Sequence, residues 1–549
     1  MATVRAPETS AERIEALGEL RALLAPQSQL GPYSRYLISN TTVALEHELS
    51  ADVAELRALM ESATVDEVKA LLTREAKRIE AALSPSIPPA GSDAVDSGAV
   101  ADDEGEVVVD AGAHAKPLKD KRVPAPTASP SGERKPNPFD AKPTPSAEEP
   151  AGGFEPADWP HASQASLPPD CWRSPFQAVR AVPRCRFDSK AAKRLMAERK
   201  PVILTDSGLI GEAAGKWDLA FLRANLRDVP CTVYASTTRH FRYWDEGMNE
   251  AGYAFGAEER TQKLSMGIDE FSERLQAAHD AAPSAPADAP GGTPTRYYFQ
   301  TALVEGTGEE LTRDFRGFDW GRLLALQRQL GWGDLTSNLL LVGQAGNTTP
   351  AHYDEQQNLF AQLHGTKRCV LFSPADYRCL YPFPVHHPCD RQSQVDLYAP
   401  DVARFPRFRE AVPLEAVLSP GDVLYIPQYW WHHIENLSHA CVSLNFWYKD
   451  TARPQKITLP LTVSQHLAMR RNIEKFVASE VGARRAHAVM PRLDAATAAG
   501  DDDVEIKGLR DKVATLLGHV MDREAVGPWL RELVDGRFEL PAPPLAVAS

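Results

Sequence analysis

The segment TPAHYDEQQN, residues 349–358, places an imidazole, a carboxylate and a carboxamide close together in the chain. In a β-strand, residues two positions apart point to the same face. His352 and Asp354 are therefore predicted to project together, with Tyr353 turned to the other face. One imidazole and one carboxylate suit a metal ion, but two ligands alone hold it poorly. The segment predicts half of a metal site, and the other half must come from elsewhere.

The segment PQYWWHHIEN, residues 427–436, offers the third ligand in His432 or His433. Two histidines and one carboxylate on one face match the ligand set of non-haem Fe(II) oxygenases, which leaves positions open for a co-substrate and oxygen. Zinc more often takes a four-coordinate site with more protein ligands. The alternative is that these residues are ordinary strand-end histidines with satisfied hydrogen bonds.

Lys367 strengthens the iron interpretation. It lies in FAQLHGTKRCVLF, residues 360–372, which predicts a strand, a tight turn and a returning strand. A lysine aimed into a barrel is unusual because a buried, unpaired charge is costly. It becomes sensible if its partner is the far carboxylate of a dicarboxylic acid. The alternative is an exposed hairpin lysine.

The elements that must position these residues are mostly short strands. From about residue 170 the chain shows β-branched and aromatic runs broken by Gly, Pro and Asn. Predicted strands lie within 200–209, 229–237, 296–304, 335–346, 358–374, 421–430, 431–438 and 440–450. Helices are predicted at 217–226 and at about 456–480 and 506–536. The predicted fold is mainly β with flanking α-helices.

Composition divides the chain into four regions. Residues 1–83 carry apolar residues at helical spacing and predict either a docking or dimerisation hairpin or a generic helical pair. Residues 84–168 are rich in Pro, Ala, Ser and charge, which predicts a disordered linker. A globular domain at 169–452 and a helical region at 453–541 follow. A further stretch at 277–295 predicts a disordered insertion.

Charge and cysteine content limit the possible partners and compartments. The 549 residues carry a net charge of -14, which argues against nucleic acid as a partner. The seven cysteines form no CxxC pair, which favours a reduced, intracellular protein over a disulfide framework. No apolar run is long enough to cross a bilayer, and the first residues do not read as a signal peptide. The prediction is a protein of the cytoplasm, the nucleus or both, without a membrane partner.

The order HxD…K…H on successive strands resembles the JmjC-type 2-oxoglutarate dioxygenases, whose core is a cupin-like double-stranded β-helix, or jelly-roll. The longest matching segments are TPAHYDEQQNLFAQLHGTKRCVLF, CLYPFPVHHPCDRQSQVD and PGDVLYIPQYWWHHIENL. They closely resemble the asparaginyl hydroxylases that inhibit the hypoxia-inducible factor, and the similarity covers about 180–540. The resemblance implies an Fe(II) cofactor, with 2-oxoglutarate and O2 as co-substrates that yield succinate and CO2.

The resemblance also assigns roles to individual residues. The iron ligands would be His352, Asp354 and His432, with His433 on the other face. The residues implied to bind 2-oxoglutarate are Tyr298, Leu341, Thr349, Asn358, Lys367 and Asn445. The residues implied to bind the target asparagine and its groove are Tyr234, Tyr243, Gln300, Arg391, Gln392, Trp447 and Asn472. The alternative for the aromatic residues is plain packing, and for Arg391 a surface position.

The implied reaction is hydroxylation of asparagine in extended segments of ankyrin-repeat or transcription-factor proteins. The C-terminal helices resemble a dimerisation module, which predicts a homodimer with Trp529 and Leu530 as interface anchors; alternatively the helices pack on their own barrel. The chain departs from the subfamily before residue 165, at 277–295 and at 484–504. Its stretch from His432 to Asn445 is also slightly shorter than in that family. Competing interpretations are a histone lysine demethylase, an RNA-modifying hydroxylase and a non-catalytic cupin scaffold.

Overall fold

The computed structural model describes residues 159–538, apart from 165–166, 227–228, 282–294, 304–307, 451–458, 494–502 and most of 246–260. Before residue 159 it describes only Arg13, Ile14 and Lys77. The helical region predicted at 1–83 and the linker predicted at 84–168 therefore lie almost wholly outside the described residues. Helix α7 (Ile268–Ala281) includes the start of the insertion predicted at 277–295, so that part is helical, and 282–294 lies outside the described residues.

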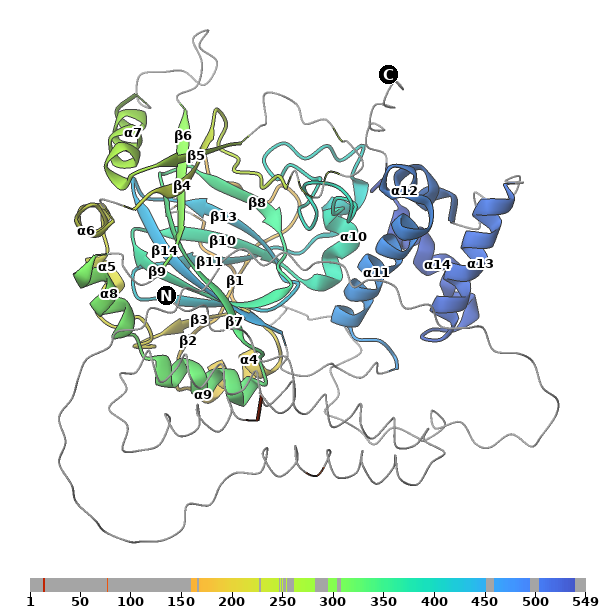
Figure 1. Ribbon diagram of the computed structural model, residues 1–549, viewed down its shortest axis with the longest axis horizontal. Coiled ribbons are helices and arrows are strands. Elements are labelled where there is room, and N and C mark those ends of the chain that lie inside the picture. The colour runs from red at the N-terminus through yellow and green to blue at the C-terminus, as the bar shows by residue number, and fades with distance from the viewer. Residues whose placement is uncertain are drawn as a thin grey trace.

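Two β-sheets form the centre of the fold (Figure 1). The smaller sheet has the strand order β1-β11-β10-β13-β8, and the larger has the order β2-β3-β12-β9-β14-β7-β6-β4-β5. Nearly all described pairs are antiparallel, and β1–β11 and β2–β3 are parallel. The predicted mainly β jelly-roll with flanking helices is confirmed.

The strands, in chain order, have the following bounds. They are β1 (Arg180–Ala181), β2 (Arg184–Arg186), β3 (Val202–Thr205), β4 (Cys231–Ser236), β5 (Gln262–Met266), β6 (Arg296–Ala302), β7 (Leu335–Gly343), β8 (Thr348–His352), β9 (Gln356–His364), β10 (Lys367–Phe372), β11 (Leu414–Leu418), β12 (Val423–Ile426), β13 (Trp431–Asn436) and β14 (Cys441–Lys449). Each strand expected from the sequence within 200–450 is present.

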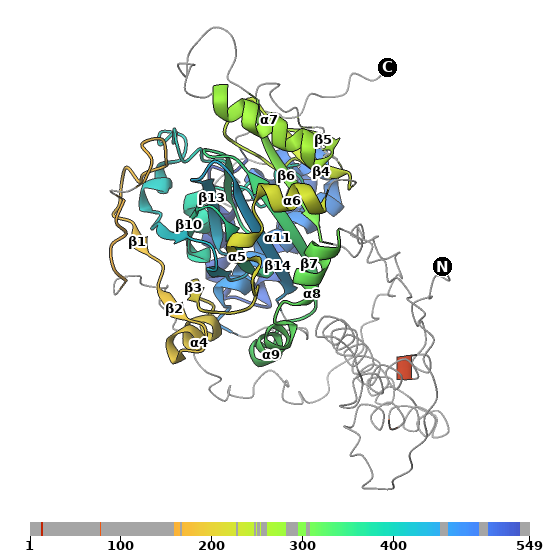
Figure 2. The same cartoon turned by 90° about the vertical axis from the view of Figure 1, so that its left-hand side faces the viewer.

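The helices gather outside the sheets. They are α4 (Lys190–Ala197), α5 (Ala213–Lys216), α6 (Leu219–Asn225), α7, α8 (Glu309–Arg316), α9 (Trp320–Leu330), α10 (Tyr377–Leu380), α11 (Val463–Val481), α12 (Ala483–Val489), α13 (Val504–Gly518) and α14 (Arg523–Val534), with short 3-10 turns at Pro374–Asp376, Pro406–Glu410 and Met490–Leu493. Helices α6 to α9 lie along the outer face of the larger sheet, as Figure 2 shows from that side. None of the described helices is both long and apolar enough to span a membrane.

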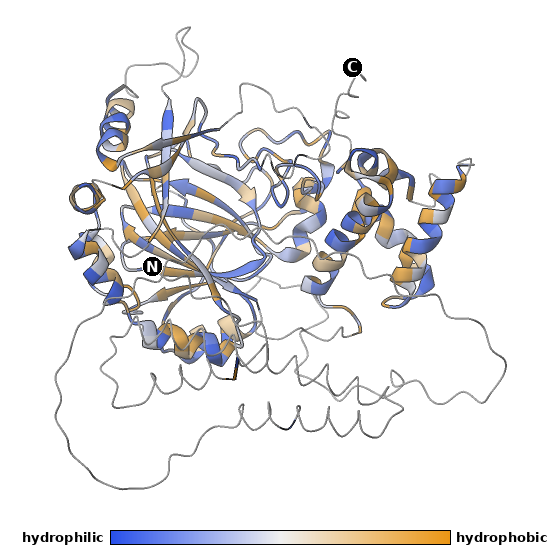
Figure 3. Cartoon of the chain, in the orientation of Figure 1, coloured by the Kyte–Doolittle hydropathy of each residue, from blue (hydrophilic) through white to orange (hydrophobic). Residues whose placement is uncertain are grey.

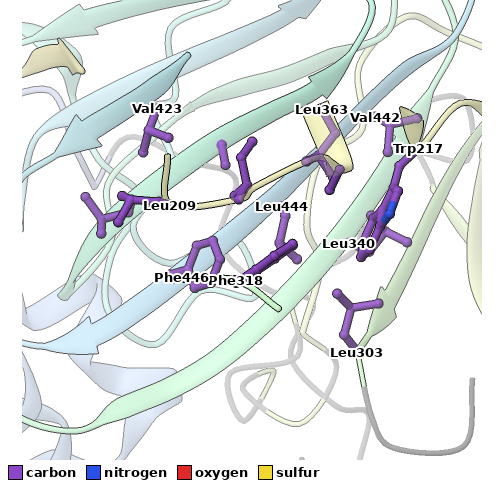
Figure 4. Close-up of a cluster of buried hydrophobic side chains, with 14 of the residues drawn as sticks. Leu209, Trp217, Leu303, Phe318, Leu340, Leu363, Val423, Val442, Leu444 and Phe446 are labelled. Carbon is purple, nitrogen blue, oxygen red and sulfur yellow. The ribbon is translucent and has the colours of Figure 1, made fainter. Parts of the chain in front are cut away.

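The outer face of the larger sheet is held by an apolar core. Leu340, Leu444 and Phe446 point outward from β7 and β14 and pack with Trp217 and Phe318 (Figure 4). Because side chains alternate along a strand, the residues between them point inward. On β14 these inward residues are Ser443, Asn445 and Trp447, so the barrel interior is polar at this strand.

A second apolar cluster lies between the two sheets. It joins Leu371 and Ile434 of the smaller sheet to Leu341, Phe360 and Leu424 of the larger one. This cluster fixes the spacing of the sheets around the polar residues of the interior. The barrel is therefore a packed shell around a small polar site.

The C-terminal helices form a separate core with alternating apolar and polar faces (Figure 3). Trp529 and Leu530 are buried in this core within the single chain, and the Trp529 indole N–H donates to His466 Nδ1 at 3.2 Å. Neither side chain is exposed to a second copy, so their predicted role as interface anchors is wrong. The homodimer itself stays a prediction.

A buried ionic group ties three strands of the smaller sheet together. Arg368 of β10 is fully buried and donates to Glu415 of β11 and to Glu435 of β13, each at 2.6 Å. It also donates to the Trp172 carbonyl at 2.7 Å. Removing one member of such a group leaves a buried charge without a partner. The resulting loss of stability exceeds the net stability that the intact group provides.

We expect Arg368→Met to lower the free energy of unfolding by about 3–5 kcal/mol, because two buried carboxylates lose their cation. Urea unfolding of the full chain, followed by tryptophan fluorescence, measures it. The matched control is Arg184→Met, whose half-exposed pair with Asp422 contributes at most about 1 kcal/mol. Equal losses of stability in the two variants would contradict the role of Arg368 as the cation of a buried ionic group.

Candidate metal centre and active-site cavity

The two histidines of the candidate metal centre face each other across one strand pair. His352 ends β8, His432 is the second residue of β13, and the two are direct partners in the antiparallel register. Their ring centroids lie 4.1 Å apart. The register of β13 shifts between His432 and Ile434, directly after the ligand position.

Hydrogen bonds orient both rings for metal binding. His352 Nδ1 lies 2.8 Å from the Pro350 carbonyl, and His432 Nδ1 lies 2.9 Å from the Trp430 carbonyl. A carbonyl only accepts, so each Nδ1 carries the proton and each Nε2 keeps a free lone pair. His432 Nε2 lies 3.7 Å from Asp354 Oδ2, and the candidate ligand atoms of all three residues lie within 4.8 Å of one another. Two lone pairs and one carboxylate at this spacing fit a divalent iron ion.

The pKa shifts of His352 and Asp354 favour the protonation states in which they can bind a metal. Burial, together with the neighbouring His432, lowers the pKa of His352 to about 3. Burial alone would raise the pKa of Asp354, but the charges of His432, His352 and Arg391 outweigh it, and the pKa lies below its ordinary value. At neutral pH the site therefore offers a neutral imidazole and an ionised carboxylate, as metal binding requires.

Trp447 holds the carboxylate ligand in place. Its indole N–H donates to Asp354 Oδ2 at 3.0 Å. The sequence predicted Trp447 as a wall of the substrate groove, and it does line the cavity. The structure adds a positioning contact, since hydrogen bonds of this kind fix the orientation of a ligating carboxylate.

A cavity of about 300 Å³ opens beside these ligands. Most residues predicted for the site line it. They are Tyr234, Tyr243, Tyr298, Gln300, Leu341, Thr349, His352, Asp354, Asn358, Arg391, Gln392, His432, Asn445 and Trp447. Residues that the sequence did not single out also line it, among them Phe241, Arg242, Leu339, Phe360, Asp390 and Ile434. Nothing in the local pattern distinguishes these from ordinary core or loop residues.

Lys367 lies behind the cavity wall. Its side chain is fully buried, its ammonium donates to Ser443 Oγ at 2.7 Å, and it sits 5.3 Å and 5.8 Å from the ring centroids of Phe360 and Tyr298, which do line the cavity. Among the described residues no carboxylate forms an ion pair with it. Burial lowers the pKa of Lys367 to about 8. A buried cation without an anion fits the far carboxylate of a dicarboxylic acid.

The amides and hydroxyls predicted to help bind 2-oxoglutarate are close together. Asn445 Nδ2 donates to Asn358 Oδ1 at 3.2 Å, and Asn445 Oδ1 is buried with no partner in the structure. Burial raises the pKa of Tyr298, and a hydrogen bond with Thr349 opposes that rise. These groups can hydrogen-bond a ligand that lies between Lys367 and the metal centre.

The loop that carries Arg391 and Gln392 is attached to β8. Tyr353 N donates to the Arg391 carbonyl at 3.1 Å, and Ser393 N donates to the Ala351 carbonyl at 2.8 Å. Arg391 has a φ of 67°, a conformation that non-glycine residues rarely adopt. The Gln392 side-chain amide N–H donates to the Tyr243 carbonyl, so one of its polar groups already has a protein partner.

Asn472 does not reach the cavity. It is exposed on α11, and the structure does not bring it together with the other predicted residues. The adjacent residue Arg471 is buried. It donates to both carboxylate oxygens of Asp390, at 2.7 and 2.8 Å, and forms an ion pair with Glu355, with Nε 2.9 Å from Oε1. A helix turns about 100° per residue, so adjacent residues face different directions. Helix α11 therefore reaches the cavity wall through Arg471, which binds Asp390 and which the sequence did not single out.

Comparisons with known proteins agree with this fold and site. Residues 188–453 match the family model described as "Cupin-like domain". The chain is 44% identical over 109 residues to "Lysine-specific demethylase 8" of Xenopus tropicalis, covering 19% of this chain and 24% of that protein. It is 40% identical over 110 residues to human "HSPB1-associated protein 1", covering 20% and 22%. It is 36% identical over 123 residues to "Lysine-specific demethylase JMJ30" of Arabidopsis thaliana, covering 22% and 28%. The matches span about a quarter of the length of these relatives.

We expect His432→Ala to abolish stable Fe(II) binding, whereas His433→Ala retains it, because only His432 faces Asp354. Metal content after anaerobic loading and desalting measures the difference. Loss of a ligand should weaken binding by more than the roughly 10–100-fold that follows loss of a ligand's hydrogen-bond partner. Iron retained by the His432 variant and lost by the His433 variant would reverse the assignment.

Proposed function

We propose that the protein is an Fe(II)- and 2-oxoglutarate-dependent hydroxylase of polypeptides. The observation that carries the proposal is the pairing of two features in one barrel. One is the His352–Asp354–His432 cluster, and the other is the buried ammonium of Lys367, which has no ion-pair partner among the described residues. A metal site alone fits many proteins, but a buried cation behind the same cavity calls for an anionic co-substrate.

Different residues would bind the two ends of 2-oxoglutarate. Lys367 would bind the far carboxylate of 2-oxoglutarate, with Tyr298 and Thr349 beside it. Asn358 and Asn445 would bind nearer the metal. When bound, Fe(II) supplies the coupled decarboxylation of 2-oxoglutarate and the transfer of one oxygen atom from O2 to a C–H bond, and the protein supplies orientation.

The proposed substrate is an asparagine side chain in an extended segment of an ankyrin-repeat or transcription-factor protein. Two features support it. Arg391 and Gln392 lie at the cavity beside the ligand strand, and Tyr243 is 53% exposed at the same wall. The resemblance of these segments to asparaginyl hydroxylases supports the same substrate.

Lysine demethylation is the second candidate. Two of the relatives above carry the name lysine-specific demethylase and align over about a fifth of this chain. Removal of an N-methyl group uses the same metal and co-substrate and differs in which carbon is hydroxylated. The choice between the two therefore depends on the groove residues.

A homodimer through the C-terminal helices, in the cytoplasm or nucleus, is part of the proposal. Leu459, Val463 and Leu516 are exposed apolar residues of this region. Apolar side chains of this kind are available for an isologous contact between two copies.

We expect purified protein with Fe(II), 2-oxoglutarate and an ankyrin-type peptide to add one oxygen atom to the central asparagine. Mass spectrometry of the peptide and a succinate assay measure the reaction. The Asp354→Ala variant is expected to lose turnover because it lacks the carboxylate ligand.

Other outcomes separate the alternatives. Formation of succinate without oxidation of the peptide would contradict the proposal that asparagine is the substrate. Formaldehyde release from an N-methyl-lysine peptide would favour the demethylase. No succinate with any peptide, together with no retained iron, would favour a non-catalytic scaffold.

We expect 2-oxoglutarate binding to weaken as pH rises above about 8. Lys367 binds the carboxylate only as a cation, and burial lowers its pKa to about 8. Below that pH the dissociation constant should be flat, and above it the constant should rise about tenfold per pH unit. Calorimetry on oxygen-free, metal-loaded protein measures it.

Lys367→Arg is the matched control, because a guanidinium stays charged across this range. Its affinity should be lower but independent of pH. A wild-type profile as flat as that of the arginine variant would contradict the role of Lys367.

A further inference from the structure

A second cavity of about 280 Å³ lies against the outer face of the ligand strands. Ala351 and His433 line it, and they alternate along β8 and β13 with the ligands His352 and His432. Arg242 and Pro350 line both this cavity and the active-site cavity. The two cavities are therefore neighbours with a shared wall.

Arg242 brings a free positive charge to the shared wall. Its side chain is half-buried, and its guanidinium lies 5.4 Å from the ring centroid of Phe383. Among the described residues no carboxylate pairs with it and no hydrogen-bond acceptor lies within reach of its N–H groups. A guanidinium packed on an aromatic ring is pre-organised to bind a carboxylate with two parallel hydrogen bonds.

His433 provides a second unpartnered group in the same cavity. It is 2% exposed, and neither ring nitrogen has a hydrogen-bond partner within the part of the chain that the structure describes. Buried polar atoms almost always have a partner, so an orphaned imidazole that lines a cavity points to a missing ligand. Its ring packs against Tyr398 at 5.7 Å between centroids, which fixes its position but satisfies neither nitrogen.

The charge of the cavity is positive. Arg242 and Arg404 line it, and Asp396 is the one carboxylate among the described residues that do. Asp396 Oδ1 accepts from Tyr398 N at 2.9 Å, and Arg404 donates to Gln394 at 3.4 Å. Of the described residues that line the cavity, Arg242 and His433 have no hydrogen-bond partner, although the charges of Glu435 and Asp396 act on His433. Both side chains can donate to an anion.

We propose that this second cavity is a carboxylate subsite that takes an acidic side chain of the polypeptide whose target residue lies in the active-site cavity. The inference rests on the proposed function and names a feature of its substrate. A polypeptide is favoured over a free small acid because Arg242 and Pro350 belong to both cavities. A chain bound at the metal centre passes over this wall and can place a neighbouring side chain behind it. Arg242 is then the specificity-determining residue.

The test is a glutamate scan of a neutral, fluorescein-labelled peptide with a central asparagine. Binding to the full chain loaded with Fe(II) and 2-oxoglutarate is measured by anisotropy without oxygen, so that no turnover occurs. At one or two adjacent positions, glutamate is expected to bind about tenfold tighter than glutamine, as a charge-assisted hydrogen bond predicts. Arg242→Leu should remove this difference, and Arg242→Lys should retain part of it.

Arg186→Leu is the control for loss of a positive charge, because Arg186 is 79% exposed and lies on β2, outside both cavities. It should keep the full preference. No preferred position, no peptide binding, or a preference that survives Arg242→Leu would each overturn the proposal. Free succinate that displaces the peptide at the peptide's own affinity would overturn the choice of a side chain.

This experiment separates the subsite from the activity. A glutamate preference that depends on Arg242 supports the subsite even if no peptide is oxidised, in which case only the hydroxylase proposal fails. Oxidised peptides without any glutamate preference leave the hydroxylase standing and overturn the subsite.

Discussion

The antiparallel pairing of β8 with β13 is the interaction on which the site depends. Directly opposed residues of such a pair have their Cβ atoms about 4.5–5.5 Å apart, close enough for two imidazoles to share one ion. The register sets His352 opposite His432, and the carbonyls two residues before each histidine orient its ring. A shift of β13 by one residue would turn His432 to the other face and leave His352 without its partner ring.

The buried charge of Lys367 is the second constraint. The surrounding strands offer it a hydroxyl and two aromatic faces but no described carboxylate. The free protein therefore holds a buried cation without an ion-pair partner among the described residues, and an anionic ligand would supply that partner. Arg242, on the wall between the two cavities, is likewise a cation without an ion-pair partner among the described residues.

The C-terminal helices hold the loop that lines the candidate metal cavity. Arg537, just after α14, pairs with Glu474 of α11 at 2.7 Å and donates to the carbonyls of Pro382 and Phe383. Glu474 accepts from Val385 N at 2.9 Å, and Arg471 pairs with Asp390. The loop that carries Arg391 and Gln392 is thus held at both ends by the helical module. Disturbing the module would disturb substrate positioning as well as any contact between copies.

The sequence by itself predicted most of the strands, the helices α6, α11, α13 and α14, and His352 and Asp354 as a candidate ligand pair, whereas it predicted neither β5 and β11 nor the helices α4, α7, α8 and α9. The two-residue spacing predicted both side chains on one strand. In the structure β8 ends at His352 and Asp354 follows it, and the two residues still lie within one ligand cluster. The sequence also singled out Lys367, since a lysine in an apolar strand is locally anomalous. The resemblance to known hydroxylases added the choice of His432 and the residues that bind 2-oxoglutarate.

Only the tertiary structure decided that Arg471 rather than Asn472 is buried against Asp390 of the cavity wall, that Trp529 and Leu530 are buried in their own module, and that Arg242 lies between two cavities. Each of these depends on contacts between segments far apart in the chain. Local pattern fixes which face a residue occupies on its own element, but the rotation and register of one element against another are set by packing.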